Sequence, residues 1–192
     1  MSAMAYPKGA KLGVDVGTVR VGLAACDPDS ILATPVRTLS RDVKKNSDIA
    51  IVLREVRERG IVEIFVGLPR TLKGAEKASA EMARAYANLL VGALVGAELS
   101  VPVRLVDERL STVSAHQSLR AAGMDSRDHR KVVDQVAAAG ILQHAIDMEK
   151  SRGGTVGTLV PAPQTGAVGR TGAPDQAKDE TITSIASPGS VL

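Results

Sequence analysis

Hydrophobic residues in the first part of the chain form short runs of the kind that β-strands use. Three such runs lie close together, and the Gly-Thr and Pro-Asp-Ser sequences between them favour tight turns. The pattern predicts strands at residues 11–17, 19–27 and about 31–39. Because only short turns connect these strands, we expect an antiparallel meander.

The next part of the chain alternates helical and strand patterns. In DIAIVLREVRERG, apolar side chains recur at helical spacing, and Gly60 supplies a common C-terminal stop. IVEIFVGLP then predicts a buried strand. The remaining predicted elements are a helix over about 75–96, a strand over 101–108 and helices over about 111–122 and 131–149. The expected order of elements is βββαβαβαα.

This order of elements predicts the topology. Strands that are joined by helical crossovers pair in parallel with right-handed connections, so strands 1, 4 and 5 should be parallel. The meander adds strands 2 and 3 on one edge. We therefore expect an α/β domain over residues 1–150, with a mixed five-stranded sheet of order 3-2-1-4-5 in which strand 2 is antiparallel.

The composition changes near residue 150. Residues 151–192 are rich in Gly, Pro, Ser and Thr and lack helical or strand periodicity. A segment of this kind buries too little apolar surface to offset the entropy of folding. The sequence therefore predicts a disordered tail over residues 151–192.

Overall composition fits a cytoplasmic globular protein. Hydrophobic residues make up 44% of the chain and aromatic residues only 2%, so the core must be built from Val, Leu, Ile and Ala. The sequence shows neither a basic segment followed by an apolar run at the N-terminus nor an apolar stretch of about 18 residues. We therefore expect no export signal and no membrane partner.

The net charge and the cysteine content limit which partners and which cysteine-based sites the protein can have. A net charge of +3 permits an anionic partner. Cys26 is the only cysteine, which excludes an intramolecular disulfide and a thiolate metal cluster. It is interpreted as a small residue that closes a strand, with an intermolecular disulfide or a redox role as the alternative.

Asp15 is out of place in the first predicted strand, KLGVDVG, because a lone buried carboxylate is costly unless it is paired or binds a cation. In a sheet of this order, ligands bind beyond the carboxyl ends of the central parallel strands. Asp15 lies late in strand 1, and Asp107 and Glu108 end strand 5. Asp134 lies in the first turn of the last predicted helix. These acids should approach one another across roughly two strand spacings of about 4.8 Å each.

Converging carboxylates repel one another unless a hard cation is present. Donors that are all oxygen suit Mg²⁺ or Mn²⁺ rather than Zn²⁺, and such sites hydrolyse phosphodiesters. Alternation along VPVRLVDE sends Asp107 and Glu108 to opposite faces, which favours Glu108. The hypothesis is that Asp15, Glu108 and Asp134 are both metal ligands and catalytic residues.

A structural role remains open for each acid. Asp15 suits a cap on the turn at Gly17-Thr18. Asp107 or Glu108 suits an N-cap for the helix that follows, and Asp134 suits a partner of its helix dipole.

Four ordered motifs, GVDVGTVRVGLA, FVGLPRTLKG, VDERLST and KVVDQVAAAGIL, together resemble the YqgF-type, RuvX-like family. Its members are described as Holliday-junction resolvases and as pre-16S ribosomal RNA nucleases. The resemblance covers about residues 10–148 and implies an RNase-H-like three-layer fold with a carboxylate nuclease site at Asp15, Glu108 and Asp134. Many members have a Lys where this chain has Val19, and Arg20 is a possible substitute.

The resemblance favours an endonuclease that processes the 5′ end of pre-16S ribosomal RNA in ribosome biogenesis. The alternative is a Holliday-junction resolvase in DNA recombination. A resolvase cuts two strands and would need two sites, which predicts a homodimer, whereas an RNA-trimming enzyme can act as a monomer. In either case the partner is nucleic acid.

Basic and hydroxyl side chains near the acids are candidates for phosphate contacts, which position a backbone without reading its sequence. They are Thr18, Arg20, Arg70, Lys73, Arg109, Arg127, Arg130 and Lys131. His129 is the histidine best placed to assist proton transfer. Scattered surface charge is the alternative for these residues.

Two rival functions remain open. VDVGTVRVG also resembles the phosphate-binding hairpin of actin-like ATPases, although those enzymes close two domains around the nucleotide and this chain offers one. A nucleic-acid-binding protein without catalysis would need only the basic surface.

Overall fold

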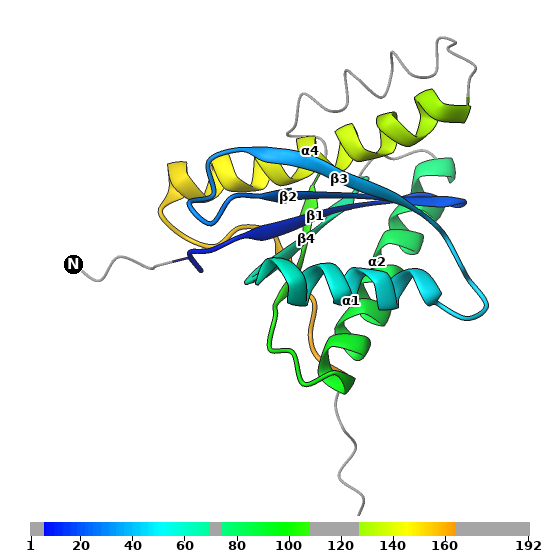
Figure 1. Cartoon of the computed structure of the whole chain (residues 1–192), viewed down its shortest axis with the longest axis horizontal. Coiled ribbons are helices and arrows are strands. Elements are labelled where there is room, and N and C mark those ends of the chain that lie inside the picture. The colour runs from blue at the N-terminus through cyan, green and yellow to red at the C-terminus, as the bar shows by residue number, and fades with distance from the viewer. Residues whose placement is uncertain (1–5, 70–73, 108–126, 164–192) are drawn as a thin grey trace, which may run out of the picture.

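The computed structural model describes residues 6–69, 74–107 and 127–163, which are built around one mixed sheet (Figure 1). The strands are β1 (Lys11–Val16), β2 (Arg20–Cys26), β3 (Ala33–Ser40), β4 (Glu63–Leu68), β5 (Val103–Asp107) and β6 (Thr158–Leu159). The described helices are α1 (Ser47–Arg59), α2 (Gly74–Gly96) and α4 (Arg127–Arg152). The helix predicted at 111–122 lies outside the described residues.

The sheet has the order β3-β2-β1-β4-β5-β6. β2 is antiparallel to both β1 and β3, whereas β1 pairs in parallel with β4, and β4 with β5. A two-residue turn closes the first hairpin, where the Gly17 amide donates a hydrogen bond to the Arg20 carbonyl at 2.8 Å. The predicted order 3-2-1-4-5 with strand 2 antiparallel is confirmed.

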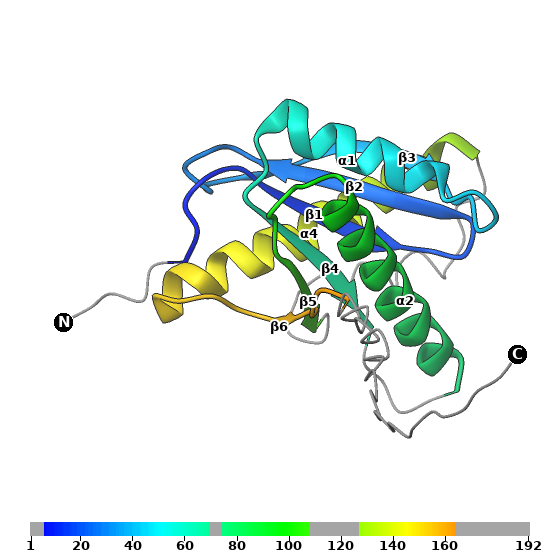
Figure 2. The same cartoon turned by 90° about the horizontal axis from the view of Figure 1, so that it is seen from below.

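A sixth strand corrects the expected count of five. β6 pairs antiparallel with β5 through Arg104↔Leu159 and Leu105↔Thr158, and it lies along that edge in Figure 2. Val156 and Val160 beside it are buried. This strand falls in the segment predicted as a tail, where a two-residue strand is too short to produce a periodic pattern. Residues 164–192 lie outside the described residues, and their disorder stays a prediction.

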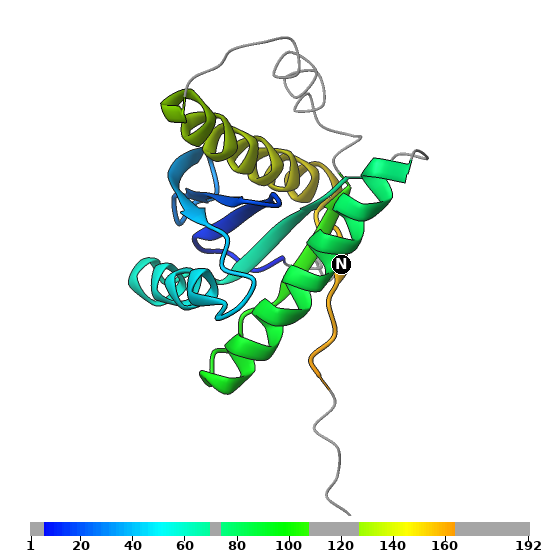
Figure 3. The same ribbon diagram turned by 90° about the vertical axis from the view of Figure 1, so that its right-hand side faces the viewer.

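Helices cover both faces of the sheet, as Figure 3 shows. α1 and α2 lie on one face above the larger apolar cluster, to which β1 contributes Leu12 and Val14. α4 lies on the other face above a smaller cluster that includes Phe65 and Val106. This is the RNase-H-like three-layer arrangement expected from the sequence. Within the described part of the chain, no helix is both long and apolar enough to span a bilayer.

α4 packs directly against the sheet backbone because β1 and β2 carry glycines beneath it. A Cβ atom at Gly13 would lie 2.6 Å from the Ala138 carbonyl oxygen. At Gly22 it would lie 2.1 Å from the Asp134 carbonyl oxygen, a distance that real Cβ atoms do not reach. Ala137 and Ala138 on the helix are fully buried. Small residues on both sides therefore set the height of α4 above the sheet.

A buried charge cluster holds the other end of α4. The Lys11 ammonium donates hydrogen bonds to Glu149 and to Glu63, the latter at 3.1 Å, and all three side chains are fully buried. Arg104 Nε also donates to Glu63, at 2.8 Å. The remaining oxygen of Glu149, Oε1, is buried without a hydrogen-bond partner in the described structure. Burial raises the pKa of Glu149 to about 7 from an ordinary value of 4.5.

Replacing Gly22 with Ala should destabilise the protein, because the new methyl group would displace the α4 backbone. We expect a loss of about 2–4 kcal/mol in the free energy of unfolding, measured by urea denaturation. Gly92→Ala is the matched control: its Cβ meets open space inside α2, so it should be neutral or stabilise by about 0.5–1 kcal/mol. Equal stability of the two variants would contradict the direct contact of α4 with β2.

The buried Glu149 predicts a pH dependence of stability. Between about pH 4.5 and 7 the folded state binds the Glu149 proton more tightly than the unfolded state. Its contribution therefore falls as pH rises through that window, by on the order of 1–3 kcal/mol. Unfolding measured from pH 4.5 to 8 should show this loss in the wild type, and Glu149→Gln should reduce it. Glu81→Gln, a change at an exposed acid on α2, should leave the slope as it is, and an unchanged slope in Glu149→Gln would contradict the assignment.

Candidate functional site

The register of the first hairpin determines which way Asp15 faces. Asp15 lies directly opposite Gly22 in the β1–β2 ladder, and opposed residues share a face of the sheet. The close approach of the Asp134 backbone to Gly22 identifies this as the face that α4 covers. The fold therefore brings Asp15 and Asp134 together near the carboxyl end of β1, and both side chains are partly buried.

Arg20 forms an ion pair with one of the two acids, Asp134. It precedes Gly22 by two residues on β2 and so projects to the same face. Its Nε donates a hydrogen bond to Asp134 Oδ2 at 2.6 Å, and the two side chains remain 30% and 22% exposed. The guanidinium offsets the negative charge that two neighbouring carboxylates would otherwise concentrate. The structure thus makes Arg20 an ion-pair partner of Asp134, and its contact with phosphate stays a prediction.

Asp134 lies deeper in its helix than the sequence suggested. α4 begins at Arg127, so Asp134 is about two turns from the N-terminus instead of in the first turn. The helix dipole acts on side chains within the first turn, so it does not explain this acid. The early start was missed because RDHRK carries no apolar periodicity. The position over Gly22 and the pair with Arg20 explain Asp134 instead.

The acids that follow β5 are only partly described. Val106 lies in the apolar cluster beneath α4, so alternation places Asp107 toward the other face. Asp107 is the last residue of β5 and is partly buried. Glu108 lies outside the described residues, and its role as the third acid stays a prediction.

The predicted phosphate contacts are described to different degrees. Thr18 and Val19 form the exposed tip of the β1–β2 hairpin, and Val19 is 67% exposed. Arg70, Lys73 and Arg109 lie outside the described residues. For four residues the structure describes only the helical backbone of α4: Arg127, His129, Arg130 and Lys131.

Two other potentially reactive side chains, Cys26 and His144, lie under α4 and within it, respectively. Cys26 is buried, accepts a hydrogen bond from the Lys11 amide at 3.2 Å, and has a pKa raised by burial. Burial also lowers the pKa of His144, which favours its neutral form. Both properties fit structural roles in packing.

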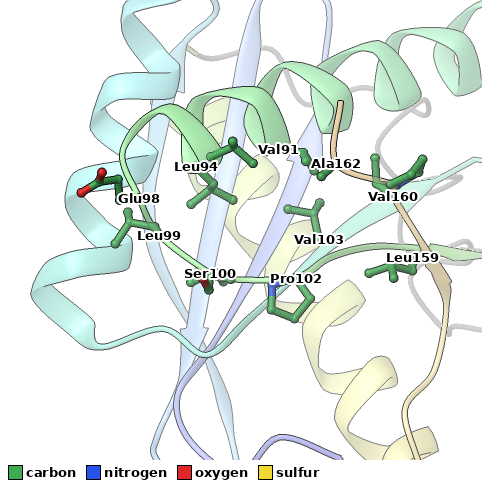
Figure 4. Close-up of a pocket in the computed structure, with 13 residues that line it drawn as sticks. Val91, Leu94, Glu98, Leu99, Ser100, Pro102, Val103, Leu159, Val160 and Ala162 are labelled. Atoms are coloured by element: carbon green, nitrogen blue, oxygen red, sulfur yellow. The ribbon is translucent and has the colours of Figure 1, made fainter. Parts of the chain in front are cut away.

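A large apolar cavity lies away from the acid site. It has a volume of about 670 Å³ and lies between the C-terminal end of α2, the start of β5 and β6 (Figure 4). Val91, Leu94 and Leu159 are typical of its apolar lining, and Glu98 is the one ionisable side chain among its described lining residues. This cavity is at the amino end of β5, whereas Asp15 is near the carboxyl ends of the parallel strands.

The chemistry of the described donors fits a hard divalent cation. Asp15 and Asp134 supply carboxylate oxygens at one place on the sheet, and oxygen donors are what Mg²⁺ and Mn²⁺ prefer. Within residues 6–69, 74–107 and 127–163, no group of three or more His, Cys, Asp or Glu side chains is arranged to hold a metal. A complete set would need a third donor from outside these ranges.

The strand order and the helices on both faces define the class as an RNase-H-like α/β domain. A sequence profile described as "RuvX: Holliday junction resolvase" matches residues 9–148. The chain belongs to this family, and it is a nuclease that hydrolyses phosphodiester bonds.

Two relatives and one solved structure illustrate the similarity. A protein of Kineococcus radiotolerans is 50% identical over 156 residues, which cover 81% of this chain and 80% of the relative. One of Mycobacteroides abscessus is 48% identical over 147 residues, covering 76% and 86%. Both carry the provisional description pre-16S rRNA nuclease. Thermus thermophilus RuvC, solved in complex with a Holliday junction substrate, has 14% identity and a TM-score of 0.49 over 79% of this chain and 99% of that one.

The Arg20–Asp134 pair should contribute little to stability, because both side chains are partly exposed to water. In a double-mutant cycle of Arg20→Ala and Asp134→Ala, we expect a coupling energy below about 1 kcal/mol in urea denaturation. A small coupling means that the pair can open without loss of the fold, as a metal-binding role for Asp134 requires. A coupling of about 3 kcal/mol would identify the pair as a structural lock and would contradict that role.

Proposed function

We propose that this chain is a metal-dependent endonuclease that acts in the cytoplasm on structured nucleic acid, and that it processes the 5′ end of pre-16S ribosomal RNA. The observation that carries the proposal is the meeting of Asp15 and Asp134 where α4 crosses Gly22. The provisional description of the relatives as pre-16S rRNA nucleases supports the substrate.

The proposed metal ligands are Asp15, Glu108 and Asp134, and the proposed ion is Mg²⁺ or Mn²⁺. When bound, such an ion would lower the pKa of a water molecule and stabilise the leaving oxygen of a phosphodiester. The chain's own part is to fix the donors. β1 and α4 are rigid elements in direct backbone contact, so the distance between Asp15 and Asp134 varies little.

Arg20 has a second task in this proposal. It holds the Asp134 carboxylate through Nε, which restricts the rotation of that side chain. The other nitrogens of a guanidinium are donors that suit phosphate oxygens. Arg20 can therefore position Asp134 and contact the scissile strand together.

The remaining predicted phosphate contacts come from several separate segments of the chain. Thr18 is exposed at the hairpin tip, three residues after Asp15. The others proposed are Arg70, Lys73, Arg109, Arg127, Arg130 and Lys131, with His129 assisting proton transfer. Contacts of this kind bind the backbone and would select nucleic acid by shape.

A second candidate substrate is the four-way DNA junction. It is favoured by the family description, which names Holliday junction resolvase over residues 9–148. Resolution of a junction needs two cuts, so this function would require a homodimer.

The two substrates can be compared directly. Wild type and Asp15→Asn are incubated with Mg²⁺ or Mn²⁺ and either a precursor 16S ribosomal RNA fragment or a four-way DNA junction. We expect wild type to cut the RNA, and Asp15→Asn to lose at least 100-fold in rate because a carboxylate donor becomes a neutral amide. Its binding of the RNA should persist, because the phosphate contacts remain.

Asp147→Asn is the control for this experiment, since Asp147 is an exposed acid on α4 that is distant from Gly22. It should cut within about twofold of wild type. Cleavage of the junction alone, by a protein whose solution mass is that of a dimer, would replace the RNA function with the second candidate. Equal cleavage by wild type and Asp15→Asn would contradict the proposed site.

A further inference from the structure

A second cavity lies beside the carboxyl end of β5. Its volume is about 260 Å³, below the roughly 300–1,000 Å³ of sites for drug-sized molecules. β6 pairs with Arg104 and Leu105, so it stops short of the last two residues of β5. The cavity lies beside these two residues, between the helices of the two faces.

Two arginines from opposite sides of the sheet line the cavity. Arg84 comes from α2 and Arg152 is the last residue of α4. Both side chains are exposed, and no ion pair within the described part of the chain engages either guanidinium. Together with the carboxylate of Asp107, the described lining carries a net charge of +1. An anionic ligand group therefore suits the cavity.

Apart from Thr158, the remaining side chains of the walls are apolar. They include Leu68, Val106 and the partly buried Met148, whose flexible thioether adapts to flat ligand surfaces. A bare phosphate would make no use of these walls. A nucleotide would use both kinds of surface, because it joins a phosphate to a flat base that stacks on side chains.

The sheet sets the distance between this cavity and the acid site. Val14 pairs with Val66, and Val66 pairs with Leu105, so Asp15 is level with Val106, two strands away. Two strand spacings are about 10 Å. A strand held at Asp15 would therefore reach the cavity with a neighbouring nucleotide.

We propose that this cavity, flanked by Arg84 and Arg152, takes one unpaired nucleotide of the substrate strand next to the bond that is cut. The apolar walls take the base, and the arginines take its phosphate. An unpaired nucleotide is required because a base held in a duplex cannot leave its stack without loss of pairing. This inference rests on the proposed nuclease function and adds a preference for an unpaired flank.

The test measures binding in the presence of EDTA, so that no cleavage occurs. Two labelled RNA stems are compared by fluorescence anisotropy, one blunt and one with an unpaired single-stranded flank. We expect full-length wild type to bind the flanked stem roughly tenfold more tightly. Arg84→Gln/Arg152→Gln should lose this advantage and bind the blunt stem within about twofold of wild type.

Arg57→Gln is the matched control, since Arg57 is an exposed arginine on α1, away from the cavity. It should keep the preference. An equal loss of affinity on both stems in the double variant would show general charge attraction and overturn the inference, as would an unchanged preference. Cleavage by a wild type that shows no preference would overturn this inference alone. A preference that depends on the two arginines, in a protein that cleaves nothing, would support this site and overturn the nuclease proposal.

Discussion

The contact between the α4 backbone and the bare backbone of β1 and β2 is the constraint on which this domain depends. Gly13 and Gly22 leave no room for a side chain, and Ala137 and Ala138 on the helix are equally small. The helix therefore has one height and one register on the sheet. Asp134 is placed beside Asp15 as a result of that register, so the site follows from packing more than from attraction between its own groups.

The two ends of β1 carry charges of opposite sign, and each end needs a different kind of compensation. Near its carboxyl end, acids approach one another and one arginine offsets their charge. At its amino end, Lys11 is fully buried and its charge is compensated by Glu63 and Glu149. α4 contributes an acid to each group, Asp134 to the first and Glu149 to the second. A shift of this helix would break both groups, so each group helps to fix the other's position.

Local patterns made most of the fold predictable. Gly60, with φ of 59°, ends α1 where a glycine stop was expected, and continuous apolar runs gave β4 and β5. The start of α4 was placed too late because charged residues form its first turn. The Arg20–Asp134 pair joins residues 114 positions apart and leaves no periodic signal in the sequence. Of the candidate site, Asp15 could be singled out because it interrupts an apolar strand, whereas the partner of Asp134 required the structure.

The short sixth strand has a consequence for the solubility of the domain. An unpaired sheet edge is a template on which other chains can add strands and aggregate. β6 covers the amino-terminal half of that edge, and Val156 and Val160 anchor it in the core. A chain cut at residue 150 would expose both the backbone of β5 and the apolar surface under these valines. The shortest well-behaved form of this protein should therefore extend to about residue 163, past the point where its composition changes.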